Sequence, residues 1–312
     1  MKRLFGCDIY AWDDRTTEPV VLCLGFFDCF HNGHKRVVDC ARNLASARSA
    51  KVAAFTFDGN PHAVLGTDRK PVFTFEERVY RMSHFGVGEI FCAAPDRVFF
   101  AIQAQEFAKT LFDAHNIVAV VAGSDYTFGA GAKGGVDMLA DVCRERGIAY
   151  EICDMLEYAP GKKIASREIE RAVAVGNIAK INEWLPKPYF VLGEVVHGRG
   201  DGKKFGFPTA NIPFPQDKLR LAAGVYATDV TIDGHTYHAV TNVGTHPTFG
   251  DESYNVESLV IGWEGDLYGK TIEVAFVARL RDIVQFDNPS ALKAQIDRDA
   301  AQALELLGGG DK

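Results

Sequence analysis

The sequence lacks any run of about 18 apolar residues, the length that a helix needs to cross a lipid bilayer. Its first residues, MKRLFGCDIYAWDD, contain two cations but no apolar stretch long enough for a secretory signal. It also lacks a block of Lys and Arg, and its formal net charge is -7, which disfavours a nucleic-acid partner. We therefore expect a cytoplasmic protein with neither a membrane nor a nucleic-acid partner. The sequence leaves self-association open.

Cysteines are few, and none of them form a Cys-x-x-Cys pair. An odd, scattered set is typical of reduced thiols rather than of a disulfide framework or a zinc site. This pattern agrees with a cytoplasmic location. The seven cysteines, all in the first half of the chain, are Cys7, Cys23, Cys29, Cys40, Cys92, Cys143 and Cys153.

The 312 residues suit two domains, and the pattern along the chain changes near its middle. In the first half, short apolar runs alternate with helical patterns, which favours right-handed βαβ units and a parallel sheet. Such sheets bind ligands at the carboxyl ends of their strands. The predicted strands are residues 20–24, 52–57, 89–93 and 117–122, and the predicted helices are residues 33–47, 76–85, 105–114 and 136–146.

From Tyr189 onward the helical pattern gives way to short β-rich runs, and Asp233-Gly234 between two of them is a strong hairpin signal. This favours an antiparallel barrel or sandwich, closed by a helix over residues 290–306, and of the two we predict an all-β Greek-key barrel. Pro186 and Pro188 stop the preceding helix, so we place the domain boundary there, with domains 1–186 and 187–312. The predicted barrel strands are residues 190–196, 225–232, 236–243, 257–261 and 271–278.

A glycine-rich segment, GRGDGKKFGFPTANI, stands near the start of the second domain. The backbone amides of Gly198, Gly200 and Gly202 can turn toward phosphate oxygens, and Lys203 can offset the phosphate charge. Thr209 and Asn211 are two residues apart on an extended stretch, so their side chains point the same way. A hydroxyl and an amide oxygen are suitable ligands for Mg²⁺. No Gly-x-x-x-x-Gly-Lys-Ser/Thr run is present, which excludes a P-loop kinase.

The unbroken Gly-Phe-Pro-Thr-Ala-Asn run at 206–211, with the segments GVYA, NVGTHPTFG and VES that follow in order, closely resembles riboflavin kinase. The resemblance implies that Gly206 belongs to the ATP site and that Thr209 and Asn211 hold ATP with Mg²⁺ or Mn²⁺. It also implies that Glu257 is the base for the 5′-hydroxyl of riboflavin. Arg281 and Phe286 fit a flavin-side motif of that family. Two positions depart from the family pattern, Leu259 and Ile283.

The other motif, GFFDCFHNGHKRVV, lies between the first predicted strand and helix. His31 and His34 are three apart, a spacing that puts both on one helix face. A helix N-terminus carries partial positive charge and free amides, which suit a triphosphate, and Gly25 and Gly33 complete the turn. Two histidines at this spacing can equally be surface residues, but the position between a buried strand and a helix favours a site.

This His-x-Gly-His motif is that of the nucleotidyltransferase superfamily, and the first half of the chain resembles the FMN adenylyltransferase module of bacterial bifunctional FAD synthetases. The resemblance rests also on the loop GSDYTFG at 123–129 and on KIAS at 163–166. It implies a Rossmann-type α/β domain, with Asp125 and Phe128 by the flavin and with Ser166 and Arg167 at the phosphates. ATP, riboflavin, FMN and FAD are then substrates or products.

Several positions of the first domain depart from that family. Cys29 and Phe30 replace a Gly-Val pair, Ala165 replaces a serine, and Glu170 stands where the family has an arginine for the triphosphate. A carboxylate about 4 Å from a phosphate charge costs up to about 4 kcal/mol at an effective dielectric constant of about 20. Three hypotheses follow: a bifunctional enzyme, a riboflavin kinase with a degenerate adenylyltransferase module, and a non-catalytic flavin-binding regulator.

Overall fold

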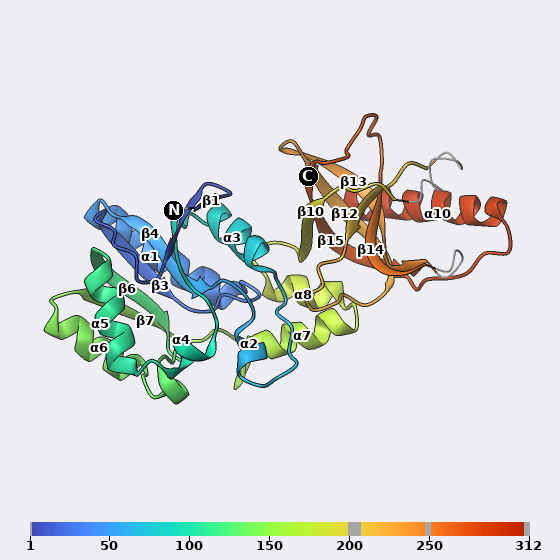
Figure 1. Cartoon of the computed structure of the whole chain (residues 1–312). Coiled ribbons are helices and arrows are strands. Elements are labelled where there is room, and N and C mark those ends of the chain that lie inside the picture. The colour runs from blue at the N-terminus through green and yellow to red at the C-terminus, as the bar shows by residue number, and fades with distance from the viewer. Residues whose placement is uncertain (1, 199–206, 247–250, 309–312) are drawn as a thin grey trace. The chain divides into compact units, whose positions relative to one another are not determined.

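The computed structural model describes residues 2–198, 207–246 and 251–308 (Figure 1). The chain divides into two compact units, residues 1–166 and 167–312. This division falls after the first residue of helix α7 (Ser166–Ala174) and before helix α8 (Ile178–Trp184), whereas the domain boundary expected from the sequence, at residues 186 and 187, follows both helices. That boundary stays a prediction.

The first unit is built on a seven-stranded sheet with the strand order β1-β2-β5-β4-β3-β6-β7. Strands β2 to β7 are parallel to their neighbours, and only the edge strand β1 is antiparallel. The strands are β1 (Lys2–Leu4), β2 (Cys7–Ala11), β3 (Val20–Leu24), β4 (Lys51–Phe57), β5 (Glu89–Ala93), β6 (Ile117–Gly123) and β7 (Ala149–Cys153). A separate two-stranded sheet pairs β8 (Glu157–Ala159) with β9 (Lys162–Lys163).

Helices cover both faces of this sheet. Residues of α1 and α3 join the strands in one apolar cluster, and residues of α5 and α6 join them in another. A strand between two such layers must be apolar on both sides, which explains the continuous apolar runs of the sequence. The predicted parallel α/β fold is confirmed. The helices are α1 (Asn32–Arg48), α2 (Pro61–Val64), α3 (Phe75–His84), α4 (Arg97–Ala101), α5 (Ala104–Ala114) and α6 (Val136–Glu145), with a 3₁₀ turn at Ala130–Ala132.

The order of the strands determines where this sheet can bind a ligand. From β3 the chain adds β4 and β5 on one side, and then returns to add β6 and β7 on the other. The loops after β3 and β6 therefore leave the sheet in opposite directions and open a crevice at their carboxyl ends. The His31–His34 motif follows β3, and the loop with Asp125 and Phe128 follows β6.

The second unit holds a six-stranded antiparallel sheet, in the order β10-β15-β12-β13-β14-β11, that nearly closes into a barrel. Closure comes from a bridge between Val196, just beyond β10, and Asn211 of β11. Between β12 and β13, Asp233 and Gly234 both have positive φ, as the predicted two-residue hairpin turn requires. The strands are β10 (Phe190–Glu194), β11 (Ala210–Pro213), β12 (Gly224–Ile232), β13 (His235–His246), β14 (Asp251–Val260) and β15 (Thr271–Arg281).

The barrel is completed by the last helix, α10 (Pro289–Gly308), which contacts β12, β13 and β15 (Figure 1). Ala303 of α10 packs in an apolar cluster with Val225, Ala227 and Val240 of the barrel. The predicted antiparallel barrel with a terminal helix is thus confirmed.

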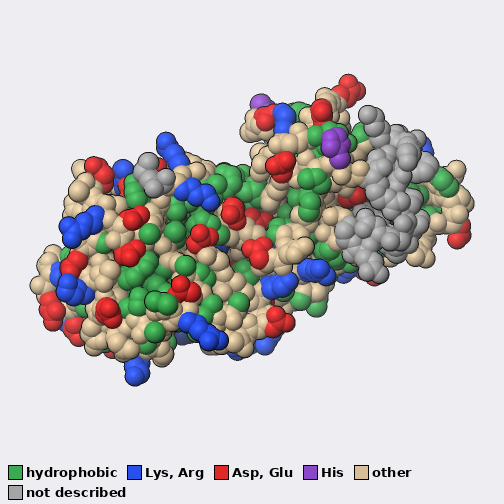
Figure 2. All heavy atoms as spheres, in the orientation of Figure 1, with side chains coloured by type: hydrophobic (Ala, Val, Ile, Leu, Met, Phe, Trp, Pro, Cys, Tyr) green, Lys and Arg blue, Asp and Glu red, His purple; other side chains and the backbone are tan. Residues whose placement is uncertain are grey.

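Charge of both signs is spread over the face of the first unit that Figure 2 shows. In Figure 2, Lys and Arg side chains lie among Asp and Glu side chains over the elements of the first unit. Within the described ranges, no helix combines the length and the apolar character needed to cross a membrane.

Candidate active sites

A pocket of about 550 Å³ lies in the first unit, where the loops after β3 and β6 meet. It gathers residues that are far apart in the sequence. The predicted site residues that line it are Gly25, His31, Gly33, His34, Asp125, Phe128 and Ser166. The crevice expected from strand order and the motifs found in the sequence therefore coincide in one cavity.

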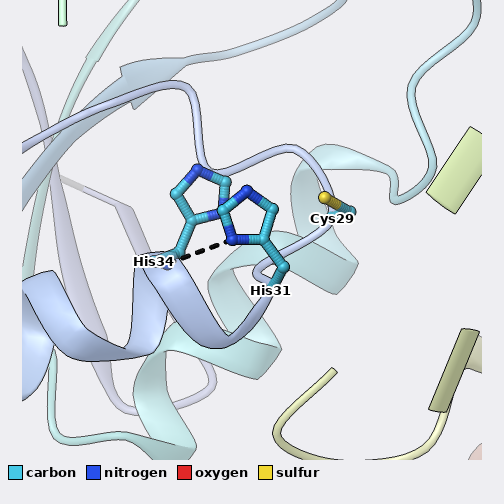
Figure 3. A group of neighbouring side chains, drawn as sticks. All are labelled: Cys29, His31 and His34. Carbon is cyan, nitrogen blue, oxygen red and sulfur yellow. Dashed lines mark hydrogen bonds between the residues drawn. The ribbon is translucent and has the colours of Figure 1, made fainter. Parts of the chain in front are cut away.

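His31 and His34 stack face to face at the start of α1, with ring centroids 3.8 Å apart and planes 8° from parallel (Figure 3). His31 is the N-cap residue of the helix, and its Nδ1 accepts a hydrogen bond of 3.2 Å from the backbone N–H of His34. Gly33 makes this arrangement possible, because a Cβ there would lie 2.9 Å from Cε1 of His31. The glycine of the motif is thus needed for the position of the first histidine.

Both imidazoles are neutral near pH 7. Burial lowers the pKa of His31 to about 4. Burial, and then the neighbouring His31, lower the pKa of His34 well below its ordinary value. Since Nδ1 of His31 accepts a hydrogen bond, the single proton of the neutral ring is assigned to Nε2. His31 therefore offers the pocket a neutral N–H donor, which suits a phosphate oxygen.

The sulfur of Cys29 and ring nitrogens of His31 and His34 lie within 4.8 Å of one another (Figure 3). The two rings are parallel, so an ion about 2.1 Å from a nitrogen of each cannot lie along both lone pairs. Cys29 is fully buried, which raises the pKa of its thiol, and its sulfur donates to Oγ of Ser166 at 3.4 Å. This trio suits an anion held by neutral donors better than a metal ion.

Two buried polar residues support the loops around the pocket. Arg78 of α3 donates to the carbonyl oxygens of Phe26 at 3.1 Å and of Phe57 at 2.7 Å, so it joins the segment after β3 to the last residue of β4. Asp28 accepts a hydrogen bond of 2.8 Å from the N–H of Val72. Phe27 and Phe30 have φ of 55° and 43°, a left-handed conformation that costs non-glycine residues energy and persists where surrounding contacts impose it.

Sequence reasoning missed the aromatic wall of this pocket. The rings lie after β3, at the end of β4, on α4, and in the loop after β6, and they supply faces on which a flat ligand can stack. Phe26 and Phe57 lie at or just beyond the ends of predicted strands, and that position is the signal that could have found these two. The residues of the aromatic wall are Phe26, Phe57, Phe99, Phe100 and Tyr126.

The phosphate-binding run expected near residue 166 is divided between the units. Ser166 lines the pocket and is the last residue of the first unit, whereas Arg167 and Glu170 belong to the second. Ala165, where the family has a serine, also lines the pocket. The roles expected for Arg167 and Glu170 stay predictions.

In the second unit, the structure brings Thr209, Asn211 and Glu257 together. Asn211 of β11 lies directly opposite Glu257 of β14 in the antiparallel register. Such partners share one face of a sheet, with Cβ atoms about 5 Å apart. Nδ2 of Asn211 donates to the carbonyl oxygen and to Oγ1 of Thr209, at 3.2 and 3.3 Å. Gly198 packs against this amide, since a Cβ there would lie 2.7 Å from Nδ2.

The remaining predicted kinase residues are placed less directly. Nε and Nη2 of Arg281 bind the carboxylate of Asp299 on α10, with a shortest distance of 2.7 Å, and the guanidinium lies 5.9 Å from the ring centre of Phe286. Arg281 therefore fastens α10 to the barrel, and its flavin contact stays a prediction. Four predicted phosphate-binding residues lie outside the described residues: Gly200, Gly202, Lys203 and Gly206.

An α/β unit with paired histidines at a helix start, joined to a barrel with an Asn–Glu pair, defines a two-domain transferase of the nucleotide-using kind. Family models agree with this class. The model described as riboflavin kinase matches residues 185–307, and the model described as FAD synthetase matches residues 13–168. The chain therefore belongs to the bifunctional riboflavin kinase/FMN adenylyltransferase family.

Individual relatives match over nearly the whole chain. The chain is 32% identical over 313 residues to the bifunctional riboflavin kinase/FMN adenylyltransferase of Escherichia coli (strain K12), covering 99% of this chain and 98% of the relative. It is 31% identical to the protein of that name from Listeria monocytogenes, with 96% of each chain covered. A crystal structure described as a macrolide-efflux protein from Streptococcus pneumoniae is 29% identical, with a TM-score of 0.81 over 96% of this chain and 98% of that one.

Proposed function

We propose that the chain makes FMN from riboflavin and ATP in its second unit, and FAD from FMN and ATP in its first. The observation that carries the kinase half is the register of β11 and β14, in which Asn211 lies directly opposite Glu257. Phosphoryl transfer requires that the reacting groups are held close together. This register places a polar side chain for ATP and a carboxylate base on the same face of the sheet.

In the proposed kinase reaction, Glu257 accepts the proton of the ribityl 5′-hydroxyl as that oxygen attacks the γ-phosphorus and ADP leaves. The half-buried position of Glu257 on the barrel wall supports this role, because water does not surround the carboxylate fully. Gly198 starts the proposed phosphate-binding loop. Arg281 and Phe286 are the proposed flavin-side residues.

The pair Thr209 and Asn211 fits a hard cation such as Mg²⁺, or Mn²⁺. The amide nitrogen of Asn211 is turned to Thr209, so the amide oxygen points away from that hydrogen bond and is the atom proposed to bind the cation. The close packing on Gly198 supports a fixed orientation of that amide. When bound with ATP, the cation offsets phosphate charge that would otherwise repel the incoming hydroxyl.

In the proposed adenylyl transfer, a phosphate oxygen of FMN attacks the α-phosphorus of ATP and diphosphate leaves. The Nε2–H of His31, His34 and the first amides of α1 are the proposed donors to the phosphates. Ser166 and Arg167 are proposed to add contacts there. Asp125, Phe128 and the aromatic wall are proposed to hold the flavin.

We also propose domains of residues 1–186 and 187–312, a cytoplasmic location and no nucleic-acid partner. All seven cysteines are unpaired thiols in the structure, which supports a reducing compartment. The mixed charges of Figure 2 support the absence of an extended basic surface for nucleic acid on the face shown. Self-association is left open.

Chromatography of the products formed from riboflavin, ATP and Mg²⁺ tests the proposal. We expect FMN to appear first and FAD to follow, because FMN is the substrate of the second step. FMN without FAD would instead support a kinase with a degenerate adenylyltransferase module, the hypothesis motivated by Ala165 and Glu170. Absence of both products would support a flavin-binding regulator.

A further inference from the structure

A second cluster of possible ligand atoms lies apart from the histidine stack. Cys40 of α1 faces Glu151 and Cys153 of β7, and the two sulfurs and a carboxylate oxygen all lie within 4.8 Å of one another. Glu151 and Cys153 are two residues apart on one strand, so both side chains point to the same face. β7 is the edge strand of the sheet, and α1 packs against it.

The spacing of the two sulfurs fits a shared metal ion. Sγ of Cys153 lies 3.6 Å from Sγ of Cys40. Two thiolates bound tetrahedrally to one zinc ion, each at about 2.3 Å, lie about 3.8 Å apart. A disulfide requires about 2.0 Å, so the observed positions are nearer to those of metal ligands than to those of a covalent bond.

Burial and charge are arranged as such a site needs. Cys153 is buried, Cys40 is half-buried and Glu151 is exposed, so the sulfurs are shielded while the carboxylate can close over an ion from the solvent side. Burial, together with Glu151 and Cys153, raises the pKa of Cys40 to about 12. Burial also raises the pKa of Cys153, although the hydrogen bond with Cys40 and, to a smaller extent, the charge of Arg36 oppose that rise. The thiols therefore carry protons in the metal-free protein, and binding of a dication would release them.

The kind of atoms selects the kind of ion. Two thiolates are soft ligands and the carboxylate is a hard one, and this combination favours Zn²⁺ over Mg²⁺ or Ca²⁺. Three protein ligands leave a fourth tetrahedral position for water. The sequence hid this set, because Cys40 and Cys153 come from a helix and a strand far apart in the chain and form no spaced motif.

We propose that Cys40, Cys153 and Glu151 bind one thiophilic divalent cation, Zn²⁺ by preference. The site is distinct from the ATP-bound cation of the kinase unit. Cys153 and Asp154 also line the pocket of the first unit, so an ion held by Cys153 would fix the strand end that forms part of the pocket wall.

The first test is a Zn²⁺ titration of the reduced full-length protein in competition with a chromogenic chelator. We expect one equivalent to bind, and Cys40→Ser and Glu151→Gln to weaken binding. Loss of the thiolate should cost more than the roughly 10- to 100-fold typical of losing a residue that only supports a ligand. Cys92→Ser is the matched control, because Cys92 is also half-buried and its sulfur donates to the carbonyl oxygen of Tyr10. Glu145→Gln, another exposed glutamate, is the control for Glu151.

A second measurement keeps the proposal testable if a cysteine variant folds poorly. On the unmodified protein, Zn²⁺ should protect Cys40 and Cys153, but not Cys92, from alkylation followed by mass spectrometry. Co²⁺ as a probe should give thiolate-to-cobalt absorption that Glu151→Gln weakens and Glu145→Gln leaves unchanged. Absence of stoichiometric binding, or binding abolished by His34→Ala but retained by Cys40→Ser, would overturn the proposal.

Discussion

The absence of a side chain at Gly198 allows the amide of Asn211 to take its observed position. A Cβ at this position would lie 2.7 Å from Nδ2 of Asn211, so alanine must push the amide away from Thr209. Overpacking of this kind costs about 1–3 kcal/mol, and we expect the KM for ATP in FMN formation to rise by about 10-fold or more. Steady-state kinetics with Gly198→Ala measures this, with Gly308→Ala, at an open position of α10, as control. An unchanged KM for ATP would mean that Asn211 does not help to bind the nucleotide.

Glu257 gives a second test at the scale of one residue. Glu257→Gln keeps the size of the side chain but removes its basicity, so we expect the turnover of FMN formation to fall by about 10²-fold or more. The KM for ATP should change little, since Asn211 is untouched. Glu273→Gln on β15 makes the same change of charge in a half-buried strand residue and should retain turnover near that of the unmodified protein. Comparable turnover in the two variants would rule out Glu257 as the base.

Motifs predicted the polar members of the pocket in the first unit but not its apolar wall. His31 and His34 were found because their residue type and spacing carry chemistry in themselves, and Asp125 was found through the resemblance of its loop to that of the family. Phe99 and Phe100 carry no such mark, since each of the 22 phenylalanines in the sequence could equally belong to a core. Only the fold shows which rings face a cavity. For the same reason, the sequence could not reveal that Cys29 contacts Ser166.

At the scale of one element, α1 depends on the charge of its N-cap. Neutral His31 accepts a hydrogen bond through Nδ1, and a proton on that atom would remove the acceptor. Burial lowers the pKa of His31 from 6.5 to about 4 in the folded protein, so the unfolded chain binds this proton first as pH falls. The contribution of His31 to stability is complete above pH 6.5, decreases as pH falls from 6.5 to 4, and changes little below.

We therefore expect His31→Asn, which keeps a cap acceptor but removes the titrating ring, to make the fall in Tm between pH 6.5 and 4.5 shallower. Thermal unfolding followed by circular dichroism at several pH values measures this, and hydrogen exchange over residues 32–48 locates it on α1. His84→Asn, at an exposed histidine of α3, is the control and should leave the slope unchanged. An identical slope in His31→Asn and the unmodified protein would contradict a buried neutral cap.

Buried strands and amphipathic helices were predicted well, whereas exposed or proline-containing strands were not. β5 (Glu89–Ala93) begins and ends as the sequence indicated, and α6 ends at Glu145, within one residue of the expected end. β7, AYEIC, was missed because an exposed edge strand of five residues has no continuous apolar run. β11, ANIP, has four residues and ends in proline, so it was identified as part of a motif and not as a strand. Its pairing with β14, on which the proposed kinase site rests, is a long-range contact that local patterns do not encode.

For the whole molecule, the two compact units have separate cores, so a substitution in one should leave the other folded. We expect His34→Ala to make FMN from riboflavin but little FAD. Glu257→Gln should make little FMN, yet it should convert supplied FMN to FAD. Each variant thus serves as the folding control of the other.

The same two variants test how FMN passes between the steps. When they are mixed with riboflavin and ATP, FAD should form, because FMN released by one chain can diffuse to the pocket of another. A chromatographic time course should show a lag before FAD that shortens as the concentration of both variants rises, as expected for a bimolecular encounter. A mixture that makes no FAD, while each variant keeps its own half-reaction, would mean that FMN is handed over within one chain and never released.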